Sequence, residues 1–257
     1  GIDILGQVAQ VDQRTGLSAE ELKAVIGEYD ALMIRSGTQV TADVIAAADR
    51  LRIIGRAGVG VDNVDVPAAT QRGVLVVNSP EGNTIAAAEH ALALLLSLSR
   101  HVPQAHGSMR SGAWDRKKYV GNELYKKVLG VVGLGKIGSH VARVAKAMGM
   151  EVIAFDPFIS ADRAQQMQVR LTTLEDLFRQ ADYITLHIPR TPDTENLVNA
   201  ELLRSMKSTA RIVNCARGGI VDEAALAEAI ENGVIAGAGL DVFASEPLAE
   251  DSPLRSV

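Results

Sequence analysis

The feature that most constrains the fold is a glycine-rich turn in the middle of the chain. An apolar run, residues 128–132, leads into Gly133-Leu134-Gly135-Lys136-Ile137-Gly138, and a helical pattern begins at once. In such a turn the first glycine permits a tight bend, the second lets a pyrophosphate lie against the backbone, and the third lets the helix pack on the strand. The free N–H groups and the dipole of the helix N-terminus favour phosphate. The pattern therefore predicts a dinucleotide-binding turn.

A second apolar run supplies the residue that this reading requires. Glu151-Val152-Ile153-Ala154-Phe155-Asp156 reads as a strand that ends in an acid, at the expected distance after the glycines. We expect Asp156 to accept hydrogen bonds from the adenosine ribose and to repel a 2′-phosphate. No arginine follows it directly, so NAD is favoured over NADP. The alternative is an ordinary strand-turn-helix with an acid at the strand end.

Composition supports a parallel α/β protein. The 257 residues are 47% hydrophobic but only 4% aromatic, so aliphatic side chains must fill the core. The formal net charge of −5 gives no sign of a nucleic-acid partner. The single cysteine, Cys215, excludes an intrachain disulfide and fits a reducing compartment. We see no signal peptide, and residues 91–96, the longest apolar run, are too short to span a membrane.

The chain is predicted to form two α/β domains, residues 1–80 and 81–257. After Lys127, strands and helices alternate, which indicates a Rossmann-type doubly wound parallel sheet. Thr84–Arg100 reads as a long helix that is apolar on more than one face, which is typical of a domain or subunit junction. The expected strands of the second domain are residues 128–132, 151–155, 183–187, 211–215 and 236–242.

The first domain alternates short strands and helices. We expect a short strand over residues 7–12 and a buried strand over residues 74–78. Ser18 and Glu21 have the spacing of a capping box at the start of a helix.

Charged residues follow two of the predicted strands in the second domain. Arg217 lies in a glycine-rich turn, where an always-charged guanidinium needs an anionic partner, and its planar fork fits a carboxylate. A structural arginine that binds loop carbonyls is the alternative. Asp241 and Glu246 follow the last strand. We expect one to contact a cofactor and the other to tune a titrating group, with solvated loop acids as the alternative.

Taken together, these segments resemble the D-2-hydroxyacid dehydrogenases. The resemblance rests on the glycine-rich turn, on Asn214-Cys215-Ala216-Arg217-Gly218-Gly219-Ile220-Val221-Asp222 and on Asp241-Val242-Phe243-Ala244-Ser245-Glu246-Pro247. Residues 55–65 and the Trp114-Asp115-Arg116-Lys117-Lys118 segment narrow it to the branch that acts on 3-phosphoglycerate. The match covers essentially the whole chain, and it implies that the first domain is flavodoxin-like and that the active site lies in the cleft between the domains.

The resemblance also implies an activity. It is the NAD-dependent oxidation of 3-phospho-D-glycerate to 3-phosphohydroxypyruvate, the first step of L-serine biosynthesis, in the cytoplasm or, in a plant, the plastid stroma. Arg217 would hold the substrate carboxylate and polarise the C2 oxygen. A histidine would act as the general base, and Glu246 would orient it and raise its pKa.

Further site residues are implied by the same resemblance, and no metal site is expected. The residues expected to contact the cofactor are Val59, Gly133, Gly135, Lys136, Ile137, Gly138, Asp156, His187, Ile188, Pro189, Cys215, Ala216, Arg217 and Asp241. The residues expected to contact the substrate are Arg35, Arg56, Val59, Gly60 and Arg217, with Arg116 supplied by a neighbouring subunit. Surface ion pairs are the alternative role for Arg35 and Arg56.

The sequence departs from the family pattern at both ends. The family's catalytic histidine lies in a Pro-His strand end after the position of Glu246, and Val257 comes first. We expect none of the five histidines of the chain to replace it, namely His90, His101, His106, His140 and His187. The resemblance also places a strand ahead of Gly1, and its loss would leave unpaired strand edges. We therefore expect a poorly stable first domain, weak NAD binding and negligible turnover in the 257-residue chain.

Two other functions stay open at this point. One is a sister enzyme that acts on glyoxylate or hydroxypyruvate. The other is a non-catalytic NAD-sensing module, as among the family's transcriptional corepressors, although the presence of Arg217 and Glu246 argues against it. The long helix and the Trp114 segment favour a homodimer, and a homotetramer is the alternative.

Overall fold

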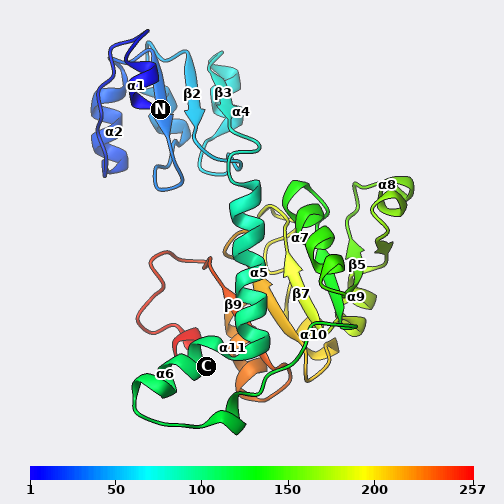
Figure 1. Cartoon of the computed structure of the whole chain (residues 1–257). Helices are drawn as coiled ribbons and strands as arrows, with labels where there is room; N and C mark the ends of the chain where they lie inside the picture. The colour runs from blue at the N-terminus through cyan, green and yellow to red at the C-terminus, as the bar shows by residue number, and fades with distance from the viewer. The chain divides into compact units, whose positions relative to one another are not determined.

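Parallel β-sheets form the framework of both parts of the chain. The computed structural model describes residues 1–257, which divide into two units, residues 1–83 and residues 84–257 (Figure 1). Each unit is an α/β structure with its own hydrophobic core, and each is described here by itself.

The larger unit contains one six-stranded parallel sheet. The strand order is β6-β5-β4-β7-β8-β9, so the order reverses between β4 and β7. Ligands bind at the carboxyl ends of the strands at such a reversal in open α/β sheets. The strands are β4 (Val128–Val132), β5 (Glu151–Phe155), β6 (Arg170–Leu171), β7 (Tyr183–Leu186), β8 (Arg211–Asn214) and β9 (Gly237–Leu240).

The central strands of this sheet are buried on both faces. Residues of β7 and β8 are buried without exception, because helices cover the sheet from both sides. The sequence accordingly shows continuous apolar runs here instead of the alternating pattern of a half-exposed strand. The helical segments are α5 (Thr84–Arg100), α6 (Val102–Arg110), η1 (Arg116–Tyr119), α7 (Lys136–Ala147), α8 (Ala161–Gln166), α9 (Leu174–Gln180), α10 (Ala200–Ser205), α11 (Glu223–Glu231) and η2 (Pro253–Arg255).

Helix α5 is the long helix that the sequence predicted, with the same bounds. It packs on α7, β8 and β9 (Figure 1) and buries Ala88, Ala91 and Leu95. Its Ser99 accepts a hydrogen bond from the buried Tyr183 hydroxyl at 3.0 Å. Leu96 stays 40% exposed, so the helix presents an apolar side chain away from this core as well.

The smaller unit contains a three-stranded parallel sheet of order β1-β2-β3. The Ser18–Glu21 capping box is confirmed: the Ser18 side chain accepts from the Glu21 N–H, and the Glu21 carboxylate accepts from the Ser18 N–H at 2.8 Å. The elements are α1 (Ile2–Leu5), α2 (Ala19–Ile26), β1 (Ala31–Ile34), α3 (Ala42–Ala46), β2 (Ile53–Arg56), α4 (Val66–Gln71) and β3 (Leu75–Asn78).

The strand predicted over residues 7–12 is absent. Residues 10–17 exchange no backbone–backbone hydrogen bond, and Val8 is exposed. A strand exists only where a neighbour pairs with it, and no strand lies beside this segment. The local sequence of residues 7–12 is therefore insufficient by itself to form a strand.

The prediction that residues 74–78 form a buried strand was wrong about burial. Residues 75–78 do form β3, but β3 lies at the edge of the sheet, and Leu75 and Val77 are 64% and 47% exposed. Val74 alone in this run is buried. Across the whole chain, the helices are either too short or too polar to cross a membrane.

Candidate functional site

The glycine-rich turn has the geometry that its sequence predicts. Gly133 follows β4 at φ +94°, where glycine is favoured over other residues, and its N–H donates to the Phe155 carbonyl at 2.9 Å. A Cβ on Gly138 would lie 1.9 Å from the Gly133 carbonyl oxygen, so only glycine lets α7 come this close to the turn. A Cβ on Gly135 would meet nothing within 4 Å. The backbone at Gly135 therefore faces open space, as a pyrophosphate site requires.

Asp156 lies beside this turn at the carboxyl end of β5. Its Oδ2 accepts from the Leu134 N–H at 2.7 Å, and its Oδ1 accepts from the Phe158 N–H at 2.8 Å. An ionised carboxylate offers about four acceptor positions, so ribose hydroxyls can still bind. Lys136 and Ile137 form the first turn of α7 next to it. The turn and the acid thus form one continuous surface that fits the adenosine half of NAD.

His187 follows β7, directly beside the glycine turn. A Cβ on Gly133 would lie 2.6 Å from the His187 carbonyl oxygen and 2.8 Å from the Ile188 side chain. The His187 ring Nε2 and the Thr185 hydroxyl are 2.9 Å apart. Burial lowers the pKa of His187 to about 4, so the ring is neutral at pH 7. Such a neutral ring suits a structural or cofactor-contacting role. Pro189, which is exposed, follows His187 and Ile188 at this edge.

Arg217 lies in the loop after β8, and Asn214 holds this loop in shape. The Asn214 amide donates to the Arg217 carbonyl at 2.9 Å, and its Oδ1 accepts from the Ala216 N–H at 3.0 Å. The Arg217 guanidinium donates to the Ala216 carbonyl at 2.6 Å, which is the contact expected of a structural arginine. The same bond fixes the guanidinium at the carboxyl edge of the sheet.

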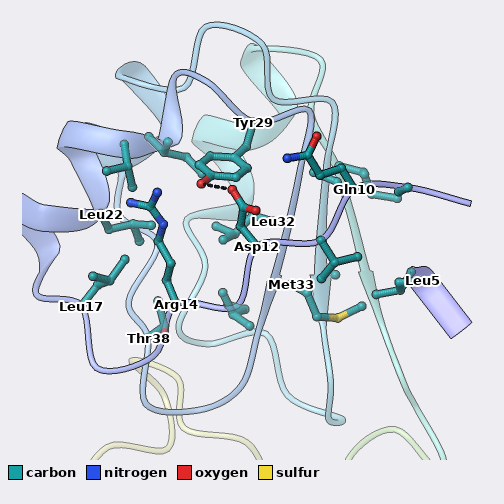
Figure 2. A pocket seen from close by; sticks show the side chains of 18 of the residues that line it. Leu5, Gln10, Asp12, Arg14, Leu17, Leu22, Tyr29, Leu32, Met33 and Thr38 are labelled. Atoms are coloured by element: carbon teal, nitrogen blue, oxygen red, sulfur yellow. Dashed lines mark hydrogen bonds between the residues drawn. The ribbon is translucent and has the colours of Figure 1, made fainter. Parts of the chain in front are cut away.

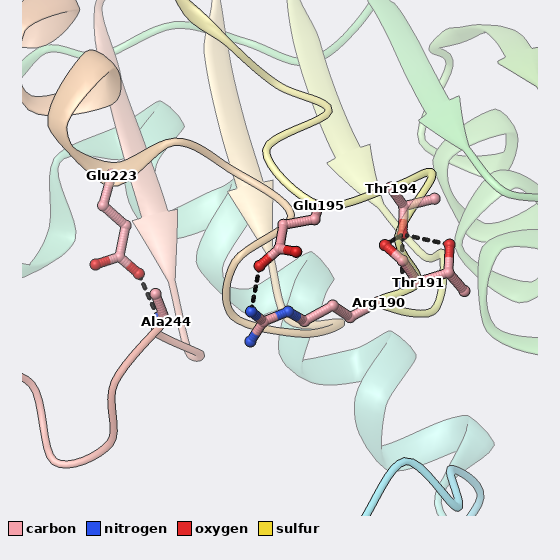
Figure 3. A network of polar contacts seen from close by, with 6 residues as sticks. All are labelled: Arg190, Thr191, Thr194, Glu195, Glu223 and Ala244. Atoms are coloured by element: carbon pink, nitrogen blue, oxygen red, sulfur yellow. Dashed lines mark hydrogen bonds and ion pairs between the residues drawn. The ribbon is translucent and has the colours of Figure 1, made fainter.

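Polar contacts lie in the loops that follow β7 and β9 and at the start of α11 (Figure 3). Arg190 pairs with Glu195, and its guanidinium lies about 3 Å from where a Cβ on Gly219 would stand. Glu223, at the start of α11, accepts from the Ala244 N–H at 2.6 Å. The loops that follow β7, β8 and β9 are therefore tied to one another.

The loops after β8 and β9 also touch directly. A Cβ on Gly218 would lie 1.8 Å from the Phe243 carbonyl oxygen, so the two backbones are in close contact. The Glu246 carboxylate accepts from the Phe243 N–H at 3.1 Å. Both contacts place the segment of Glu246 next to the loop of Arg217.

Asp241 has a partner that the sequence did not reveal. Its Oδ1 lies 3.1 Å from the His90 ring Nε2, and His90 comes from α5. Burial, assisted by the Asp241 charge, raises the pKa of the Cys215 thiol to about 12. Cys215 is thus a neutral thiol at the edge of the sheet. The pairing of His90 with Asp241 depends on α5 packing against β9, and residue spacing alone does not predict it.

Four of the expected site residues lie in the smaller unit. Arg56 ends β2, and its guanidinium lies across Gly58, where a Cβ would come 1.6 Å from its Nη1. The buried Nε of Arg56 has no hydrogen-bond partner. Arg35 is exposed after β1, and the half-buried Val59 and Gly60 follow β2. An anionic ligand could satisfy this buried arginine donor.

The structure brings most of the expected cofactor residues of the larger unit to one edge of its sheet. They follow β4, β5, β7, β8 and β9 in turn. Arg116 is set apart from this edge in sequence and lies exposed in η1. The sequence analysis did not predict the contacts by which three residues hold parts of this site in place. These residues are Asn214, Thr185 and His90.

Comparison with known proteins agrees with this geometry. Residues 92–257 match the family model described as D-isomer specific 2-hydroxyacid dehydrogenase, NAD binding domain. A D-3-phosphoglycerate dehydrogenase from Synechocystis is 64% identical over 250 residues, which cover 97% of this chain and 45% of that protein. One from Archaeoglobus fulgidus is 52% identical and covers 95% of this chain and 46% of that protein. The chain therefore spans about half the length of the curated relatives it matches.

Solved structures share the fold. A protein from Thermus thermophilus superposes with a TM-score of 0.91 at 36% identity, covering 99% of this chain and 82% of that one. A formate dehydrogenase from Staphylococcus aureus in complex with NAD superposes with a TM-score of 0.82 at 31% identity, covering 93% of this chain and 72% of that one. The family model, the relatives and the glycine turn agree, and the chain belongs to the D-isomer specific 2-hydroxyacid dehydrogenases, whose NAD-binding domain its residues 92–257 form.

Proposed function

We propose that the full-length protein oxidises 3-phospho-D-glycerate to 3-phosphohydroxypyruvate with NAD, as the first step of L-serine biosynthesis. The observation that carries this proposal is the 64% identity, over nearly the whole chain, to a protein named D-3-phosphoglycerate dehydrogenase. The site supports it, because the glycine turn and Asp156 fit NAD, while Arg217 is fixed at the same edge of the sheet.

Each site residue of this chain then has its own role in the proposed reaction. The glycine turn and Asp156 would hold NAD, and the bound cofactor would supply the acceptor for the hydride from C2 of the substrate. Arg217 binds the substrate carboxylate through its planar fork and orients the C2 hydroxyl. Glu246 is proposed to position the general base and to raise its pKa. Asp156 would hold the adenosine ribose, the glycine turn after β4 would hold the pyrophosphate, and the residues after β7, β8 and β9 would hold the remainder of the cofactor.

The general base is assigned to none of the five histidines of the chain. His187 is neutral and bonded to Thr185, and His90 is paired with Asp241. His140 lies beside Arg143 on α7, at 3.1 Å. His101 is the N-cap of α6 and His106 lies in the middle of this helix, away from the loops that carry Arg217 and Glu246 in sequence. We expect the 257-residue chain alone to show negligible turnover.

The phosphate of the substrate is assigned to arginines of the smaller unit. Arg56 is proposed as the principal contact, because its buried Nε lacks a partner. Arg35 is proposed as a second contact, from its exposed position after β1, with Val59 and Gly60 lining the substrate. Arg116 is proposed to reach the phosphate from a neighbouring subunit of a homodimer or homotetramer.

The test compares phosphorylated and unphosphorylated substrates in the full-length protein. We expect a much higher kcat/KM for 3-phosphoglycerate than for glycerate, measured by the absorbance of NADH. Charge-assisted hydrogen bonds contribute about 1.5–3 kcal/mol, so Arg56→Gln should lower kcat/KM for 3-phosphoglycerate about 10- to 100-fold and leave that for glycerate unchanged. Arg52→Gln, which alters an exposed arginine of the same strand region, is the matched control. Equal kcat/KM values for 3-phosphoglycerate and glycerate would favour a sister enzyme that acts on glyoxylate or hydroxypyruvate. Equal values for phosphohydroxypyruvate and hydroxypyruvate in the reductive direction would favour it as well.

A further inference from the structure

Helix α5 brings one side chain, His90, to the edge of the sheet at which the cofactor is proposed to bind. The helix packs closely on β9 (Figure 1), because a Cβ on Gly239 would lie 3.1 Å from the Leu98 Cδ1 and 3.4 Å from the Leu94 Cβ. His90 lies one turn before Leu94 on the same face of α5, about 6 Å along the helix. Asp241 lies two residues after Gly239 on the same side of the strand, about 6.6 Å along it. The close packing at Gly239 therefore brings the His90 Nε2 to 3.1 Å from the Asp241 Oδ1.

The backbone of Asp241 is held independently of His90. Its N–H donates to the Asn214 carbonyl at 3.0 Å, which continues the pairing of β9 with β8. The Asp12 carboxylate of the smaller unit shows the opposite case, since it accepts from the Tyr29 hydroxyl at 2.9 Å (Figure 2) in a segment without backbone pairing. There the side-chain contact holds the chain itself. At Asp241 the His90 contact has one remaining effect, which is to fix the direction of the carboxylate.

The contact with His90 occupies one oxygen of the Asp241 carboxylate. An ionised carboxylate only accepts hydrogen bonds, so the His90 Nε2 is the donor whether the ring is neutral or protonated. It binds Oδ1, and Oδ2 remains able to accept from a ligand. Burial, assisted by the Asp241 charge, raises the pKa of Cys215, so the carboxylate lies close to another residue of the expected cofactor site. The fixed carboxylate therefore belongs to the surface on which the cofactor is proposed to lie.

The pair of His90 and Asp241 contributes little to the stability of the fold. The two side chains are 48% and 50% exposed, and pairs at this exposure add little to the free energy of unfolding. A ligand that covers the pair excludes water from it, and a hydrogen bond strengthens when the local dielectric constant falls. The contact therefore matters more for ligand binding than for folding.

We propose that His90 is a positioning residue, which holds the Asp241 carboxylate so that its Oδ2 accepts a hydrogen bond from NAD. The inference rests on the proposed function, in which Asp241 contacts NAD. Without the His90 donor, the carboxylate rotates freely about its side-chain torsions, and binding must then order it at an entropic cost. His90→Leu should therefore weaken NAD binding. His90→Gln should largely preserve it, because the glutamine side-chain amide also donates.

The test is a calorimetric titration of the full-length protein with NAD, which needs no turnover. We expect His90→Leu to raise the Kd for NAD about three- to tenfold, the usual effect of one hydrogen bond, and His90→Gln to raise it less than about twofold. His106→Leu makes the same change at an exposed position of α6 and should leave the Kd unchanged. The Tm of all three variants should stay close to that of the wild type, because both histidines are exposed.

A double-mutant cycle separates positioning from a general effect on the structure. Asp241→Ala removes the carboxylate, so adding His90→Leu to it should not raise the Kd for NAD any further. Steady-state kinetics of His90→Leu should show a raised KM for NAD and an unchanged KM for 3-phosphoglycerate. An unchanged Kd in His90→Leu, an equal loss in His90→Gln, or additive losses in the cycle would overturn the inference. The proposed function would survive these results if the wild-type protein still reduced NAD with 3-phosphoglycerate, whereas a wild-type protein that does not bind NAD would overturn both.

Discussion

Asp156 is oriented before any ligand arrives, because two backbone N–H groups bind its two carboxylate oxygens. The Arg217 loop is ordered in a comparable way by Asn214. Such ordering lowers the conformational entropy that the protein must lose when a ligand binds. Substitutions of these residues should therefore change affinity or rate more than they change the fold.

For Asp156 we predict a loss of NAD affinity. Asp156→Ala removes charge-assisted hydrogen bonds to the ribose, so the Kd for NAD of the full-length protein should rise about 10- to 100-fold. Asp156→Asn keeps one acceptor for the Leu134 N–H and should lose less. Calorimetric titration gives the Kd, and circular dichroism checks the fold. An unchanged Kd in the alanine variant would remove Asp156 from the cofactor site.

For Arg217 we predict a loss of catalysis. Arg217→Lys keeps the charge but loses the planar two-point grip on a carboxylate, so kcat/KM of the full-length protein should fall by orders of magnitude. Arg179→Lys is the matched control, since Arg179 makes an exposed ion pair with Asp176, which contributes little. Steady-state kinetics give kcat/KM for both variants. Near-wild-type rates in the Arg217 variant would contradict the assignment.

For His187 we predict an effect of pH on stability. Its pKa is about 4 in the folded chain and near 6.5 when unfolded, so the unfolded state binds more protons between these values. The contribution of neutral His187 is complete above about pH 6.5 and is lost as pH falls toward 4. Tm should therefore drop between pH 7 and pH 5, and His187→Gln should reduce this drop. His106→Gln, at an exposed position of α6, should not alter the drop.

At the scale of elements, the turn between β4 and α7 contains one glycine that is needed for packing and another that is needed for ligand binding. Gly138 lies against the Gly133 carbonyl, whereas the backbone at Gly135 faces open space. Both are glycines of one turn, and both belong to the same sequence pattern. The space around each glycine nevertheless differs, so Gly138 contributes to the stability of the fold and Gly135 leaves room for the ligand.

The two glycines should consequently respond differently to alanine. Gly138→Ala should destabilise the larger unit by about 1–3 kcal/mol, because the added methyl forces α7 away from the turn. Gly135→Ala should lower the free energy of unfolding by only about 0.5–1 kcal/mol, because alanine is a poorer helix N-cap than glycine. It should nevertheless weaken NAD binding about tenfold or more, because the methyl occupies the pyrophosphate site. Urea unfolding and NAD titration of both variants measure the contrast, and a reversed order would refute it.

Elements with a continuous apolar pattern and clear ends were predicted well. The bounds of β4, β5 and α5 agree with the sequence prediction, because buried strands and a long apolar helix carry their own signals. The strand expected over residues 7–12 failed because pairing is a tertiary property. The same limit applies to the site: the glycine turn and Arg217 were visible as motifs, whereas the His90–Asp241 pair required α5 to be placed against β9.

At the scale of the whole molecule, the two units differ in how well their backbones are satisfied. The larger unit has a six-stranded sheet with its central strands fully buried. The smaller unit has three strands, an exposed β3 and a segment without backbone pairing. Local stability follows buried apolar contacts and protected hydrogen bonds, so the two units should open independently.

We predict that the smaller unit unfolds first. Amide protection over residues 1–60 should be low, with opening free energies at least about 2 kcal/mol below those of β4 and β7. Native-state hydrogen exchange in the 257-residue chain measures both sets of amides. Uniform high protection across the two units would contradict this prediction, because the unpaired backbone groups of the smaller unit would then lower its stability less than we infer.

The near-contact of Gly218 with the Phe243 carbonyl has a consequence for protein engineering. Any side chain at position 218 must push away the strand end that carries Asp241 and Glu246, so the two loops cannot diverge separately. A chimera that imports the Arg217 loop from another dehydrogenase should need the recipient's residues 241–247 exchanged in the same graft.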